Sequence, residues 1–421
     1  MRKVTVVFLF WAAALSSAPH AQVPVTSLTF DEAIARALLE NPTVAEAAEA
    51  ITRAHTLIDQ ARAVTRPRIE ARIVNTTLDS KQGFEGGVVV PQNQMTFTGL
   101  ISLPVLDPAR WADRVQADDQ LEVATRSTVE ARQQVATATA QAFLAVIAAR
   151  RQVEVEARAI ENAEAHHDYA TIRLEGGVGS RLDQLRAGQQ VAVGEGLLER
   201  ARFALLQSQE ALGVLVAANG PVDAADEPAF DVPASIDESM WMNARPDLRT
   251  QTAIILAAER IVEDSWKDVA PYGELAFEPQ YITPAGLFFP SRTWRLTFTV
   301  TQPIYLGGLQ GTVKRERQVT FDESRLRLTA LEIQARSQVR IAQAAVRSFE
   351  RMLASARRAA DQADQVLSIT TTAFEAGAST NIEVVDAQRA ARDLQTATVQ
   401  VLDSLQRARL DLLVAIGRFP G

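Results

Sequence analysis

The chain contains no cysteine, which excludes disulfides, thiolate metal sites, cysteine nucleophiles and a lipid anchor on an N-terminal cysteine. Aromatic residues make up only 6% of its 421 residues. Long hydrophobic runs are also missing, since no stretch beyond the N-terminal region approaches the roughly 18 apolar residues that indicate a transmembrane helix. The sequence therefore predicts neither a membrane-spanning helix nor a lipid anchor.

The N-terminus has the pattern of a secretory signal peptide. Arg2 and Lys3 precede an apolar run over residues 4–15, which is too short to span a bilayer, and small residues follow it. We expect cleavage after Ala21, which removes two positive charges and no negative one, so the net charge changes from −8 to −10. An acidic exported chain is a poor nucleic-acid ligand. The mature protein is then either soluble outside the cytoplasm or crosses a membrane as a β-barrel.

The pattern of helices and strands occurs twice along the chain, which indicates an internal duplication. The first half predicts two helices, two strands and two helices, at residues 28–42, 43–66, 69–78, 95–103, 109–175 and 181–217. The second half predicts a helix, two strands and two helices, at residues 246–271, 273–282, 294–302, 309–376 and 381–416. We therefore divide the chain into a signal peptide, a first repeat, a linker or equatorial segment and a second repeat, at residues 1–21, 22–217, 218–240 and 241–421.

The longest predicted helices exceed anything in an ordinary globular domain, because a helix over residues 109–175 is about 100 Å long. The shorter helices should stack end to end beside it, so that each half forms a hairpin rod. Steps of three and four residues between apolar or small side chains predict a coiled-coil seam on the last helix of each half. The two seams comprise Leu198, Ala201, Leu205, Ser208, Leu212 and Leu215, and Leu394, Ala397, Val401, Leu405, Ala408, Leu412 and Ala415.

The predicted strands have the length of tilted strands that cross a bilayer, about nine to eleven residues. In the strand at 294–302, three apolar residues alternate with three polar ones: Leu296, Phe298 and Val300 with Arg295, Thr297 and Thr299. We expect the apolar set to face lipid and the polar set to line a lumen. Four strands cannot close a membrane barrel, whose smallest known form has about eight, whereas three chains would supply twelve. The polar segment at 79–87 is predicted to be a loop.

Two short stretches share one turn chemistry, "EGGVGSRLDQL" at 175–185 and "EAGASTNIEVV" at 375–385. Gly177 and Gly377 suit the left-handed position that ends a helix. A hydroxyl residue followed three positions later by an acid is the pattern of a capping box, and Ser180 with Asp183 and Thr380 with Glu383 have this spacing. Each stretch therefore ends one long helix and begins the next.

This order of elements resembles the TolC family of outer-membrane efflux proteins. The residues that carry the resemblance are the proline-bounded strand pairs and the segments "LTFDEAIARALLENP" (28–42), "QPIYLGG" (302–308), "SRLDQLRA" and "TNIEVVDA". The resemblance implies an α+β membrane protein, a homotrimer with four strands per chain in a 12-stranded outer-membrane β-barrel that a long periplasmic α-helical barrel continues. It also implies the outer membrane of a Gram-negative bacterium as the location.

The implied function is the exit duct of a tripartite efflux pump that exports drugs or other small molecules. The partners implied with it are outer-membrane lipid, a periplasmic adaptor (membrane fusion) protein and an inner-membrane pump of RND or ABC type. Within this interpretation, type I protein secretion and metal-cation efflux are alternatives. A periplasmic coiled-coil adaptor protein is an alternative of a different class, and it is disfavoured because isolated two-stranded hairpins are marginally stable in water.

The resemblance places two sites at the helical turns. The residues expected to dock the adaptor are Gly177, Val178, Gly179, Ser180, Arg181, Leu182, Gly377, Ala378, Ser379, Thr380, Asn381 and Ile382. The acidic residues expected to narrow the periplasmic gate are Asp183, Glu383 and Asp386, of which Asp386 has no capping role. Ser379 stands where the family pattern has an arginine, and Phe374 where it has a tyrosine, so the contacts of the closed state must differ here.

No motif in the sequence indicates an enzyme, a cofactor or a metal site. His166 and His167 are adjacent and therefore point about 100° apart on a helix, so they cannot bind one metal together. The methionines form no chelating cluster, which gives no support to handling of soft metals.

Overall fold

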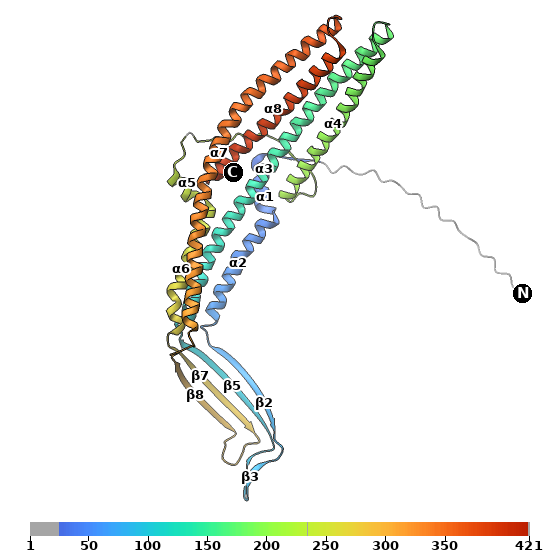
Figure 1. The fold of residues 1–421 in the computed structure, drawn as a ribbon. Helices are drawn as coiled ribbons and strands as arrows, with labels where there is room; N and C mark the ends of the chain where they lie inside the picture. Colours follow the sequence, from blue (N-terminus) through green and yellow to red (C-terminus); the bar gives the residue numbers. More distant parts are fainter. Residues whose placement is uncertain (1–24, 234, 420–421) are drawn as a thin grey trace, which may run out of the picture.

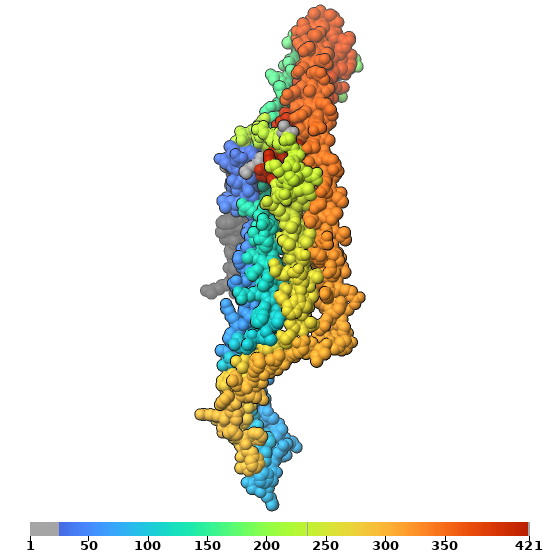
Figure 2. Space-filling model, turned by 90° about the vertical axis from the view of Figure 1, so that its left-hand side faces the viewer, coloured from blue at the N-terminus to red at the C-terminus, as the bar shows by residue number. Residues whose placement is uncertain are grey.

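The computed structural model describes residues 25–233 and 235–419, so the expected signal peptide at 1–21 lies outside the described residues. The molecule is elongated, with a β-sheet at one end and two helical hairpins at the other (Figure 1). The space-filling view shows the sheet continuing the helical rod beyond a bend (Figure 2).

The helices are α1 (Phe30–Glu40), α2 (Pro42–Ala63), α3 (Pro108–Glu175), α4 (Arg181–Leu215), α5 (Glu238–Ala244), α6 (Pro246–Glu263), α7 (Leu309–Glu375) and α8 (Asn381–Ala415), with a 3-10 helix, η1 (Asp264–Val269), after α6. The strands are β1 (Thr26–Leu28), β2 (Arg68–Thr77), β3 (Gln82–Phe84), β4 (Gly87–Val90), β5 (Asn93–Leu106), β6 (Val222–Ala224), β7 (Tyr272–Thr283) and β8 (Arg292–Thr301).

The long helices form a wall one layer thick. Close to the sheet, neighbouring helices follow the order α2, α3, α6, α7, and towards the turns they follow the order α4, α3, α8, α7 (Figure 1). The predicted arrangement, with shorter helices beside a longer one, is therefore confirmed for α2 and α4 against α3. The wall has two open edges, one formed by α2 and α4 and the other by α7.

Local sequence determines where α1 and α2 begin. The Thr29 hydroxyl accepts a hydrogen bond from the Glu32 N–H at 3.3 Å, and the Glu32 carboxylate accepts one from the Thr29 N–H at 2.9 Å. Asn41 then caps α2 by accepting from the Thr43 N–H at 2.9 Å, and Pro42 occupies the first helical position, where a missing N–H costs no hydrogen bond.

The main core lies midway along the wall, where the hairpins meet α1 and the segment before α6. The Phe143 side chain is fully buried and meets the Phe30 ring edge to face at 5.5 Å, while Phe30 also meets Phe230 at 5.6 Å. The predicted seams contribute buried side chains to the helical hairpins, namely Leu198, Ala201, Leu212, Leu405, Ala408, Leu412 and Ala415.

The principal sheet has the order β2-β5-β7-β8, and each neighbouring pair is antiparallel. One row across it pairs Arg72 with Thr98, Thr98 with Gln280, and Gln280 with Thr293. The four predicted strands are confirmed to within a few residues at each end. The sheet is open, with β2 and β8 at its edges.

The segment predicted to be a loop, residues 79–87, contains strand structure, so the sequence prediction is wrong there, and the segment at 218–240 also contains a short strand. The hairpin β3–β4 begins within 79–87 and extends to Val90, and it packs on the loop between β7 and β8: the Leu287 N–H donates to the Val88 carbonyl at 2.9 Å, and Phe84 stacks on Phe288. The linker at 218–240 contains β6, which pairs in parallel with β1, and Arg150 of α3 bonds to Asp223 at 2.6 Å. Both segments are held in place by residues that are distant in the sequence.

The helix predicted over residues 246–271 is also shorter than expected. It ends at Glu263, and η1 continues the chain to Val269. One tertiary and one local contact accompany this change: Asp264 accepts a hydrogen bond from Gln116 of α3 at 3.1 Å, and it pairs with Lys267 at 2.7 Å within η1.

Candidate functional site

The two faces of the principal sheet differ in chemistry. One face exposes apolar side chains, namely Ile69, Ile73, Met95, Phe97, Ile101, Trp294, Leu296, Phe298 and Val300. At least half of the surface of Leu296, Phe298 and Val300 is exposed in the single chain. Because side chains alternate along a strand, the residues between them lie on the opposite face.

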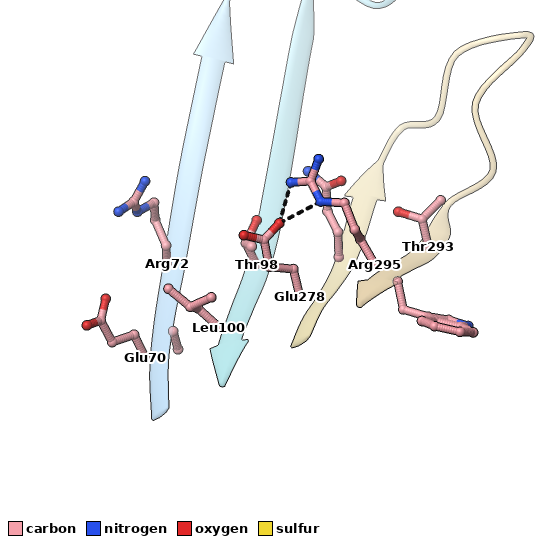
Figure 3. A pocket seen from close by; sticks show the side chains of 10 residues that line it. Glu70, Arg72, Thr98, Leu100, Glu278, Thr293 and Arg295 are labelled. Carbon is pink, nitrogen blue, oxygen red and sulfur yellow. Dashed lines mark hydrogen bonds and ion pairs between the residues drawn. The ribbon is translucent and has the colours of Figure 1, made fainter. Parts of the chain in front are cut away.

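The opposite face is polar and holds a concave pocket of about 550 Å³ (Figure 3). Glu70 and Arg72 come to it from β2, Thr98 and Leu100 from β5, Glu278 from β7, and Thr293 and Arg295 from β8. The Arg295 Nε donates to the Glu278 carboxylate at 3.0 Å across neighbouring strands. This face therefore presents charges of both signs.

The two helical turns at the far end have the same backbone geometry. Gly177 and Gly377 adopt φ angles of 74° and 79°, which confirms the predicted left-handed positions. In the first turn, the Val178 and Gly177 N–H groups donate to the carbonyls of Arg173 and Leu174, each at 3.0 Å. The second turn repeats this pair of bonds, which is the Schellman ending of a helix.

The capping residues differ between the turns. Thr380 and Glu383 form the predicted reciprocal capping box, in which the Glu383 carboxylate accepts from the Thr380 N–H at 2.9 Å. At the first turn the predicted box is wrong: the Ser180 hydroxyl accepts from the Leu182 N–H at 3.0 Å, and Asp183 does not bond back. The Asp183 main chain is engaged instead, because its carbonyl accepts from the Asn381 Nδ2 at 3.3 Å.

The predicted gate residues lie at the starts of α4 and α8, which this Asn381 contact brings together. Glu383 and Asp386 are exposed and three residues apart on α8, whereas Asp183 is half-buried. Hydrogen bonds from the Ser379 hydroxyl and the Thr380 N–H lower the pKa of Glu383 below its usual value. The carboxylate therefore keeps its charge to a lower pH than a free glutamate would.

The predicted docking residues form the outermost surface of the two turns. The first turn exposes apolar side chains, with Val178 at 72% and Leu182 at 54% exposure, and the second exposes Ile382 at 44%. Asn381 differs from the others because it is 4% exposed and points between the helices. The first turn therefore offers more apolar surface than the second.

A cluster that the sequence prediction missed joins the two hairpins just below the turns. The Arg173 guanidinium donates to the Phe374 carbonyl at 3.0 Å and lies 5.0 Å from the Phe374 ring centre. The Tyr169 hydroxyl donates to the Glu375 carbonyl at 3.0 Å, and His166 Nε2 lies 2.6 Å from Asn381 Oδ1. The sequence spacing could have indicated this cluster. His166, Tyr169 and Arg173 are three and then four residues apart, which places all three on one face of α3.

Among residues 25–233 and 235–419, no helix combines the length and the apolar character needed to cross a membrane. Within the same ranges, no group of three or more His, Asp or Glu side chains is arranged to hold a metal ion.

A sheet with one exposed apolar face, continued by a wall of very long helices with open edges, defines the class of channel subunits that build a tunnel. The chain belongs to the outer membrane efflux protein family, which its sequence matches over residues 33–218 and 289–418. The expected family and the expected function, an outer-membrane exit duct for efflux, are thereby confirmed.

Solved channel structures have the same fold. The CmeC outer membrane channel of Campylobacter jejuni gives a TM-score of 0.81 at 14% identity, covering 99% of this chain and 94% of that one. VceC of Vibrio cholerae gives 0.76 at 18% identity, covering 92% and 96%, and the open-state MtrE channel of Neisseria gonorrhoeae gives 0.76 at 16%, covering 93% and 89%. No protein with curated annotation matches the sequence.

Proposed function

We propose that three copies of this chain close into one continuous duct, which carries small molecules out of the periplasm for a tripartite efflux pump. The observation that carries this proposal is that this chain has two open edges. They run along the sheet, at β2 and β8, and along the helical wall, at α2 with α4 and at α7. Both edges need a partner, and a second and third copy of the chain would supply it.

The sheet supports closure by three chains. All ten residues of the edge strand β2 are exposed. Each strand of the sheet runs antiparallel to its neighbour, so β8 of one copy would also pair antiparallel with β2 of the next. Three copies would then give twelve strands around a lumen. The apolar face would then contact outer-membrane lipid, and the polar pocket face would line the lumen.

The helical wall supports the same closure. The edge helix α7 exposes Val319, Leu326 and Ile333, which share one side because they are spaced by seven residues. On the other edge, α4 exposes Phe203 at 60% and Val214 at 73%. Apolar surface on both edges is expected where helices of neighbouring copies pack.

The turns would be the periplasmic end of the duct, where the docking residues would meet an adaptor protein coupled to an inner-membrane pump of RND or ABC type. Exposed Val178, Leu182 and Ile382 support a protein contact there. Type I protein secretion and metal-cation efflux use the same architecture and stay open as alternatives. Deletion of the gene, scored by drug, metal and protein export, distinguishes the three cargo classes.

Membrane fractionation followed by native mass determination tests the architecture. We expect a detergent-extracted trimer from the outer membrane whose electrophoretic mobility changes on heating. Release by salt or urea, with no heat-modifiable form, would instead identify a peripheral coiled-coil adaptor protein and would contradict the duct.

We also propose that Glu383 and Asp386 form carboxylate rings at the mouth of the duct, since threefold symmetry repeats each of them around one axis. Such rings attract cations and repel anions. Replacing both, as Glu383→Gln with Asp386→Asn, should reduce cation selectivity and leave the trimer intact. The reversal potential under a salt gradient in planar bilayers measures this selectivity.

Glu161 and Glu164 provide a matched control, because they are exposed on α3 with the same three-residue spacing. Their replacement by glutamine should leave the reversal potential close to that of the wild type. Equal shifts from the two pairs, or no shift from either, would refute the gate assignment.

A further inference from the structure

The Asn381 side chain links three helices, α3, α4 and α8, at the point where the two hairpins meet. His166 on α3 and Asn381 on α8 are 6% and 4% exposed, and His166 Nε2 lies 2.6 Å from Asn381 Oδ1. The Asn381 Nδ2 donates to the carbonyl of Asp183 on α4. Because the amide nitrogen already has an acceptor, the amide oxygen is the acceptor for an N–H on His166 Nε2.

The surroundings of His166 combine burial with charges of both signs. Phe374 of α7 covers the imidazole at a ring-centre distance of 5.1 Å, and the Arg173 guanidinium lies on that same phenyl ring. Two charged groups act on His166: Asp183 on α4 favours a charged imidazole, and His167 on α3 opposes it. The residue of α8 that bonds to His166 is the neutral Asn381. On α7 the residue that covers it is Phe374, and the next residue, Glu375, carries a carboxylate.

We propose that His166 is a positioning residue for the gate: its neutral side chain holds the start of α8 against α3 and α4, and protonation releases this hold. The proposal rests on the function proposed above, since it assumes that the acidic residues Glu383 and Asp386 at the start of α8 border the mouth. The alternative, a purely structural hydrogen bond, would give no response to pH.

The direction of the pH response follows from the burial of His166. Burial is the main cause that lowers the pKa of His166 below its ordinary value, and it outweighs the hydrogen bond to Asn381 and the charge of Asp183. A His166 exposed to water by separation of the hairpins would regain a pKa near 6.5. The separated arrangement therefore binds the proton more tightly, so acidification below about 6.5, through the lower pKa of the buried His166, favours it. Each unit of pKa difference shifts the equilibrium about tenfold.

Single-channel recording of the intact trimer at neutral and mildly acidic pH tests the proposal. Wild-type open probability should rise as the pH falls below about 6.5, and the rise should approach about tenfold per unit of pKa difference once the pH is below the pKa of the buried His166. His166→Gln keeps an N–H donor but cannot be protonated, so its open probability should stay low and independent of pH. His55→Gln is the control, because His55 is exposed on α2 away from this cluster, and it should respond to pH as the wild type does.

A second measurement does not depend on conductance. The chain has no cysteine, so labels on Val178→Cys and Ala378→Cys report the distance between the two turns without background. This distance should increase in acid when residue 166 is histidine and stay constant in His166→Gln. The same pH response in wild type and His166→Gln overturns the proposal. If the wild type forms no channel, the proposed duct fails instead, and the label distance still tests His166.

Discussion

Phe298→Arg should prevent insertion of the protein into the outer membrane. Phe298 lies on the apolar face of β8 between Leu296 and Val300 and is 60% exposed in the single chain. If this face contacts lipid near mid-bilayer, arginine costs about 2–4 kcal/mol per chain. This cost corresponds to a loss of roughly 30-fold to 1,000-fold in the inserted fraction. The amount of heat-modifiable trimer in the outer-membrane fraction measures it.

Thr297→Arg is the matched control, because it introduces the same charge at the next residue on the opposite, polar face. We expect it to insert normally, since that face already carries Arg72 and Arg295 beside Glu70 and Glu278. Normal insertion of Phe298→Arg, or equal loss from both variants, would show that the apolar face does not meet lipid.

Gly377→Val should abolish drug resistance in cells while leaving trimer assembly intact. Gly377 has a φ angle of 79°, which a β-branched residue adopts only with strain, so the second turn should distort. An added Cβ would meet no atom within 4 Å, so the effect should arise from the backbone and stay local. Minimal inhibitory concentrations in a complemented deletion strain measure resistance, and native mass measures assembly.

Gly196→Val supplies the comparison for this substitution. Gly196 lies within α4 at a negative φ, and an added Cβ there also has no atom within 4 Å. Resistance should therefore survive this change. Full resistance in Gly377→Val would contradict a docking role for the second turn.

The regular elements of this fold could be predicted because their signals are local. The period of apolar residues predicts the long helices. Gly177 and Gly377 predict where helices end, because glycine readily adopts the left-handed conformation. Proline at Pro42 and Pro246 marks helix starts, because the residue needs no N–H partner there. All of these depend on a few neighbouring residues.

The parts that could not be predicted depend on contacts between distant segments. The strand β6 forms because β1 lies beside it, nearly two hundred residues earlier in the chain. Asp183 was expected to cap α4, but the structure leaves that side chain unbonded and uses the carbonyl for Asn381. His166 was visible in the sequence as one of two adjacent histidines, and only the packing of α3 against α8 reveals its partner.

Hydrogen bonds between the hairpins lie beside the two residues that differ from the family pattern, Phe374 and Ser379. Phe374 has no hydroxyl, and the Tyr169 hydroxyl bonds across the hairpins instead, to the carbonyl of Glu375. Ser379 carries no charge, and Arg173 supplies the cation that reaches the other hairpin. These contacts could not be inferred from the sequence alone, because Tyr169 and Arg173 lie on α3 whereas Phe374 and Glu375 lie on α7.

The length of α8 makes it a lever. Its 35 residues extend about 52 Å, from a buried end around Leu412 to Asn381, where the second turn leads into the helix. A tilt of about 10° at the buried end would move the turn by about 9 Å, given that length. If the turns form the mouth of the duct, as proposed above, small changes in side-chain packing at Leu405, Ala408 and Leu412 are amplified there, and substitutions several nanometres away should alter its width.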